Sequence, residues 1–113
     1  MATLENFSSE SQLGTTASNL FSTNGSETKF IGNLTLTNTS TSKAEVTLWR
    51  ISTSTTATTG SGGNWVFRES IPAGKTIKVL KLVGHVLGPS MAIQGLADTD
   101  AVVNYDASGT TET

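Results

Sequence analysis

The chain has 113 residues, which suits one compact domain and is too short for two. Only 14 % of the residues are charged and the formal net charge is −2, so the composition excludes a protein that binds nucleic acid by neutralising phosphates. The sequence holds no cysteine, which excludes disulfides, and no apolar run approaches the roughly 20 residues that span a bilayer.

The first residues, "MATLENFSSESQ", lack the basic and apolar segments of a secretory signal. We therefore expect synthesis in a cytoplasm and no membrane partner. Serine and threonine together make up roughly 30 % of the residues. Threonine favours extended backbone because its Cβ is branched, so this composition favours β-structure.

Taken in chain order, the apolar residues predict about seven short strands between polar ends. Residues 1–12 indicate an N-terminal arm, residues 109–113 a C-terminal tail, and residues 13–108 the domain between them. Apolar and polar residues alternate there with the period of two of a half-buried strand, and no helical period occurs. The expected strands cover residues 17–21, 28–38, 44–51, 64–68, 75–82, 91–96 and 101–105.

Turn residues separate these strands. The Asn-Gly pair in residues 23–26 indicates a tight turn, and the polar residues 38–43 indicate a second one. In "IPAG", Pro72 presets φ and Gly74 accepts a positive φ, which predicts a turn. Residues 52–63, "STSTTATTGSGG", predict a long polar loop.

The alternation also predicts which side chains are buried. We expect Ile77, Val79 and Val86 in the core. Trp49 and Ile51 have the opposite parity to the other apolar residues of their strand, which predicts a bulge or a second buried face. Strands at this spacing indicate an all-β fold, an antiparallel β-sandwich of immunoglobulin-like or jelly-roll type.

Candidate chemical residues are few. His85 could join Ser90 and an aspartate in a catalytic triad, but no Gly-x-Ser-x-Gly motif frames any serine. Asp98, Asp100 and Asp106 could bind Ca²⁺, but their spacing matches no calcium loop, and aspartate is common in turns. We therefore assign no catalytic, cofactor-binding or metal-binding residue, and we expect no enzymatic activity.

Aromatic side chains offer one alternative. Trp49, Trp65, Phe67 and Tyr105 could form a sugar-binding surface, and alternation places Trp65 and Phe67 on one face of a strand. In a sandwich of this size such residues are more often core. The glycine-rich residues 60–63 have neither the lysine nor the helix that a phosphate-binding loop requires.

The order of features resembles a known group. A strand ending "LTLTNTSTSKAEVTLWRI" is followed by a Ser/Thr/Gly-rich loop, an aromatic strand and "IPAGKTIKVLKLVGHVLGPSMAIQGLADTDAVVNYDAS". This order resembles small β-sandwich structural proteins of tailed bacteriophage virions, with residues 34–40, 71–74 and 87–108 matching. The resemblance covers about residues 17–108. Where relatives carry Gly-Asp, this chain has Gly88-Pro89, which removes a backbone donor and an acid.

The resemblance implies a virion protein assembled in the host cytoplasm. It favours a head decoration (cement) protein that stabilises the capsid by interface burial, with a neck, tail or fibre component as the alternative. A carbohydrate-binding module for host-surface recognition is the alternative of another class. The implied partners are copies of itself, as a trimer or a lattice-bound protomer, and the major capsid protein or another virion protein. We expect the contacts at residues 1–12, 107–113 and the loop 52–63.

Overall fold

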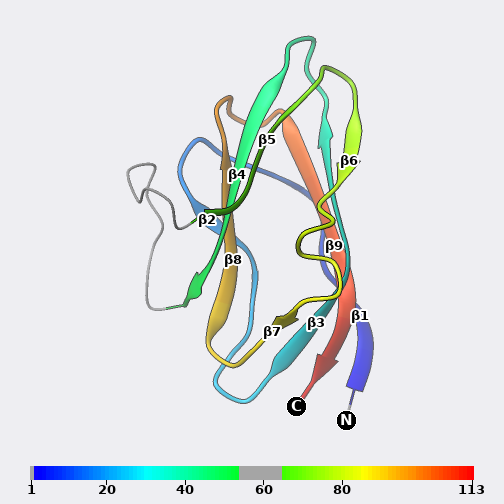
Figure 1. The fold of residues 1–113 in the computed structure, drawn as a ribbon, viewed down its shortest axis with the longest axis vertical. Coiled ribbons are helices and arrows are strands. Elements are labelled where there is room, and N and C mark those ends of the chain that lie inside the picture. The colour runs from blue at the N-terminus through cyan, green and yellow to red at the C-terminus, as the bar shows by residue number, and fades with distance from the viewer. Residues whose placement is uncertain (1, 54–64) are drawn as a thin grey trace.

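The computed structural model describes residues 2–53 and 65–113, and these ranges contain strands, turns and loops only (Figure 1). The all-β expectation is confirmed, with nine strands in the described ranges where the sequence predicted about seven. The strands are β1 Ala2–Gln12, β2 Ser18–Ser22, β3 Thr28–Asn38, β4 Ala44–Ser52, β5 Trp65–Ile71, β6 Thr76–Lys78, β7 Val86–Leu87, β8 Met91–Ala97 and β9 Val103–Glu112.

The strands form two antiparallel sheets packed as a sandwich. One sheet has the order β1-β9-β3-β6, with β7 also paired to β3, and the other has the order β2-β8-β4-β5. The antiparallel pairs are β1/β9, β2/β8, β3/β6 and β4/β5, so the first strand of the chain pairs with the last and each further pair lies inside the previous one along the sequence. This is the order of a jelly roll, so the pairing selects that architecture over the immunoglobulin-like one.

The core lies between the sheets and follows the predicted alternation. In β3, Leu34 and Leu36 are fully buried, and in β4 Val46 and Leu48 are as well. Each strand thus contributes alternate residues to one apolar layer, which is the main source of stability in a small sandwich.

A second apolar cluster covers the outer side of the β2-β8-β4-β5 sheet. Trp49 is buried there with Ala17 and Leu96, and Ile51 and Trp65 pack against them. A register shift lies between Leu48 and Trp49 in the pairing of β4 with β5. Both expectations for this strand, a bulge and a second buried face, are therefore confirmed.

The chain ends are strands, which corrects the predicted arm and tail. Residues 1–12, expected as an arm, contain β1, and residues 109–113, expected as a tail, continue β9. The two strands pair from Ala2 opposite Glu112 onward, so both termini lie at the same end of the sandwich (Figure 1). Polar residues form strands here because the backbone N–H and C=O groups make the pairing whatever the side chains are.

The expected strand at residues 75–82 is shorter than predicted. Only Thr76–Lys78 pairs with β3, and the chain then turns. Val79 is fully buried as expected, and Ile77 is half-buried. The expectation for Val86 was wrong, because β7 has two residues and Leu87 occupies its inner side, which leaves Val86 45 % exposed.

Candidate functional site

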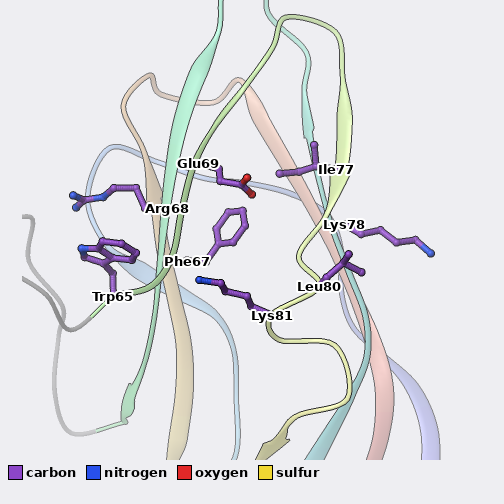
Figure 2. A pocket seen from close by; sticks show the side chains of 8 residues that line it. All are labelled: Trp65, Phe67, Arg68, Glu69, Ile77, Lys78, Leu80 and Lys81. Carbon is purple, nitrogen blue, oxygen red and sulfur yellow. The ribbon is translucent and has the colours of Figure 1, made fainter.

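A groove lies at the open edge of the sandwich, between β5 of one sheet and β6 of the other. Its volume is about 600 Å³. Figure 2 shows Phe67, Ile77 and Lys81 directed toward the space between the two strands, while Lys78 points away from it. The groove is lined by Trp65, Phe67, Arg68, Glu69, Ile77, Lys78, Leu80 and Lys81.

The lining of this edge is cationic. A neighbouring groove of about 420 Å³ shares Lys81 and is also lined by Arg50, Val66, Leu82 and His85. The two linings together hold four of the seven lysines and arginines, and Glu69 is their one acid. A chain with a net charge of −2 therefore concentrates positive charge along one edge.

Two of the lining residues are held by contacts outside the groove. The Arg68 guanidinium lies 5.0 Å from the centre of the Trp65 ring, and its Nε donates a hydrogen bond of 3.2 Å to Thr47 Oγ1. These contacts fix Arg68 over the outer side of the sheet. The Lys81 ammonium is thus the main cation that faces the apolar Phe67 and Ile77 side chains (Figure 2).

The arrangement suits an extended acidic polypeptide. In the described part of the chain, β5 pairs only with β4 and β6 pairs only with β3, so both strands present a free edge to the groove. A free edge can pair with a strand from another molecule, and pockets beside it select the side chains. Here the pockets would select apolar side chains against Phe67 and Ile77, and acids against Lys81 and Arg50.

Sequence reasoning missed this groove, although a signal was present. Lys75, Lys78 and Lys81 fall within seven residues of a chain that has only seven lysines and arginines. In a regular strand this spacing would place Lys78 on the opposite face from Lys75 and Lys81. The turn after β6 brings Lys81 back toward β5.

The residues considered for catalysis and metal binding are spread over the molecule. His85 is exposed beside β7, Ser90 lies in the turn before β8, and Asp106 is exposed in β9. Asp98 and Asp100 share the turn between β8 and β9, where Asp98 Oδ1 accepts a hydrogen bond from Glu45 N at 3.0 Å. Within the described ranges, no three His, Cys, Asp or Glu side chains gather closely enough to hold a metal ion.

The four aromatic residues do not share a surface. Trp49, Phe67 and Tyr105 are buried, and Trp65 is half-buried. The expectation that Trp65 and Phe67 share a face was wrong. The register shift pairs Phe67 with Leu48 and Trp65 with Trp49, so Phe67 joins the central core and Trp65 the outer cluster.

The loop expected at residues 52–63, with its glycine-rich residues 60–63, lies outside the described residues from residue 54 onward. No helix long and apolar enough to cross a membrane occurs in residues 2–53 or 65–113. Comparison with protein families, with curated proteins and with solved structures finds no match to this chain.

Proposed function

We propose that this protein is a non-enzymatic structural component of a tailed-phage particle, and specifically a head decoration protein. It stabilises the shell by burying surface against the major capsid protein and against copies of itself. Assembly takes place in the host cytoplasm, and the protein then resides in the virion.

The observation that carries this proposal is the nested strand order of the sandwich. Jelly rolls of this kind are the architecture of many viral capsid and lectin domains. The fold is compatible with several functions, so this support is an analogy at the level of architecture.

The motifs that carry the sequence resemblance add a second support, because they form one hydrogen-bonded unit. Asn38 ends the "LTLTN" strand, and its Nδ2 donates a hydrogen bond of 2.9 Å to the carbonyl oxygen of Ile71 in "IPAG". Gly74 N in turn donates to Asn38 O at 2.9 Å. Two motifs separated by about thirty residues thus depend on each other, as expected of a shared structural signature.

We assign the contact with the shell to the cationic groove between β5 and β6. Its occupant is an extended, acidic segment of the shell protein that pairs with the free edge of β5. Charge complementarity supports this choice, since Lys81 faces the groove and Arg50 lines the neighbouring one, against Glu69 as the one acid of the two linings.

Purified particles from the source of this chain test the role. Mass spectrometry should detect the protein at high copy number, and immunogold labelling should place it on the head. Label confined to the neck, tail or fibres would show that the protein is a component of that part of the particle and not a head decoration protein. Absence from the particles would overturn the proposal.

Charge reversal tests the groove. Lys81→Glu and Arg50→Glu should each reduce occupancy on stripped particles at least tenfold. Lys43→Glu, at an exposed residue of the turn before β4, is the matched control and should bind as the unaltered chain does. Equal binding of all three variants would show that the groove does not contact the shell protein.

A carbohydrate-binding module is the second candidate, and one observation favours it. Trp65 is half-buried beside the groove and carries Arg68 over its ring, an arrangement that could stack on an anionic sugar. A glycan array separates the candidates, because saturable sugar binding that is lost in Trp65→Ala would favour the module.

A further inference from the structure

Exposed apolar side chains gather in one row across the outer face of the β1-β9-β3-β6 sheet. Leu4 of β1 is opposite Thr110 of β9, Thr110 is opposite Phe30 of β3, and Phe30 is opposite Val86 of β7. Leu4 is 84 %, Phe30 40 % and Val86 45 % exposed. Three of the four large exposed hydrophobic residues in the described part of the chain therefore line up, and the fourth, Leu80, lies elsewhere.

A second row on the same face carries opposite charges. Thr35 of β3 is opposite Lys78 of β6 on one side and Asp106 of β9 on the other. Lys78 and Asp106 are both exposed, and their neighbours Ile77, Tyr105 and Ala107 pack in the core, so the two charged side chains point outward. Figure 2 shows Lys78 directed away from the groove.

We infer that this face binds the same face of a second copy, around a two-fold axis that runs parallel to β3. The axis exchanges the strands on either side of β3. It places Phe30 on Phe30 of the second copy, Val86 on Thr110, and Lys78 on Asp106. One symmetry operation thus covers Phe30 and Val86 and pairs the charged row, as an isologous interface requires, and it leaves Leu4 outside the contact.

The contact is small, so the dimer should be weak. The axis along β3 sets β9 of one copy against β6 and β7 of the other, and β1 with Leu4 lies beyond the contact. β3 has 11 residues, β9 has 10, and β6 and β7 have three and two. At ~3.3 Å per residue and ~4.8 Å between strands, these strands cover on the order of 400 Å² per copy. Two such faces bury less than the ~1,200 Å² of a standard interface, which is the range of weak association.

The surface also lacks the usual protection against association. Apart from Lys78 and Asp106, the one charged residue that β3, β6, β7 and β9 direct outward is Glu112, at the end of β9. The other outward residues of β3 and β9 are mostly Thr, Ser and Asn, which are short enough for two sheets to pack at about 10 Å. This inference deepens the self-association in the proposed function, because it names the surface.

Sedimentation equilibrium and light scattering on the full chain test the inference. The unaltered chain should form a dimer as its concentration is raised into the high micromolar range. Phe30→Glu should weaken the dimer at least a hundredfold, because it buries two unpaired carboxylates at the axis. Leu80→Glu changes an equally apolar residue outside the rows, which is 73 % exposed, and should leave the dimer unchanged.

Exchanging the two charges provides a second test, because a misfolded variant would not be rescued by the second substitution. Lys78→Asp and Asp106→Lys should each weaken the dimer about tenfold, and the double variant should restore it. Circular dichroism confirms that each variant is folded. A monomer, a trimer, or a dimer indifferent to Phe30→Glu would overturn the inference. A dimeric protein that is absent from particles would overturn only the virion role.

Discussion

At the scale of single residues, Asn38 has the largest structural role that the sequence pattern did not indicate. Its side chain is fully buried, and its Nδ2 donates to the carbonyl oxygens of Ser42 and Ile71 at 2.8 and 2.9 Å. Its Oδ1 accepts from Ser40 N at 3.0 Å and from Ser40 Oγ at 2.8 Å. One amide therefore joins the turn before β4 to the turn before β6.

Replacing this amide should be costly. Asn38→Ala leaves buried backbone groups without partners, so we expect unfolding free energy to fall by about 3 kcal/mol. Thr39→Ala is the control. It removes one exposed hydrogen bond, from Thr39 Oγ1 to Val102 O, and should cost no more than about 1 kcal/mol. Urea denaturation measures both, and equal costs would show that Asn38 is not the link between the turns.

Glycine has two different roles in this chain, and substitution distinguishes them. A Cβ on Gly109 would overlap the carbonyl oxygen of Phe30 and lie 2.8 Å from Gly32 N, because β3 and β9 approach closely at a bulge. Gly74 has a φ of 71° and open space around it. The first glycine is required by contact and the second by conformation.

We expect Gly109→Ala to lower the unfolding free energy by about 3 kcal/mol or more, since backbone atoms would have to move. Gly74→Ala should cost about 1 kcal/mol, the usual penalty for a positive φ. Thermal denaturation of the two variants in parallel tests the order. If Gly74→Ala were the more damaging, the close approach of β3 and β9 would be wrong.

At the scale of elements, β1 is part of the sheet and is anchored by side chains. The rings of Phe7 and Phe21 lie 5.1 Å apart, and Lys29 Nζ lies 5.3 Å from the centre of the Phe7 ring. Lys29 Nζ also lies 3.7 Å from Glu5 Oε1 and 3.4 Å from Glu27 Oε1. Thr111 Oγ1 donates to Glu5 Oε1, so β1 is attached to both β3 and β9.

Removal of β1 should therefore destabilise the sandwich. Deleting residues 1–12 uncovers the edge of β9, and we expect a lower melting temperature and loss of solubility. Phe7→Ala isolates the anchoring contact and should cost about 2 kcal/mol, as for a half-buried ring. Thr3→Ala, exposed in the same strand, should change little. If the truncated chain has the same melting temperature as the full chain, residues 1–12 are an arm that the sandwich does not need.

The edge strands β5 and β6 carry charged residues. Arg68 and Glu69 belong to β5 and Lys78 to β6, whereas Lys29 of β3 and Glu45 of β4 lie on strands inside their sheets. Charged side chains on an edge disfavour pairing with an arbitrary strand, so a partner at this edge must complement them.

At the scale of the whole molecule, stability should be independent of metal ions. Asp98 already accepts a backbone hydrogen bond, and Asp106 lies outward in β9, away from the turn that holds Asp98 and Asp100. Addition of a chelator should leave the melting temperature unchanged. A large decrease that calcium reverses would identify a site that these positions do not suggest.

The sequence by itself determined the β class, the positions of most strands and turns, and the inward positions of Leu34 and Leu36 in β3 and of Val46 and Leu48 in β4. These features are local, because alternation with period two and turn residues act over a few positions. The positive φ of Gly74 follows in the same way. A local pattern assigns each side chain to a face of its strand, but it does not determine which strand pairs with it.

Only the tertiary structure decided which strands are neighbours. The pairing of β1 with β9 joins the two ends of the chain and turns an expected arm and tail into a sheet. Bulges then reverse local parity, which separates Trp65 from Phe67. The apolar row is made by residues far apart in sequence, and the groove lies between two strands that belong to different sheets. Both features therefore exist only once non-local backbone pairing has set the register.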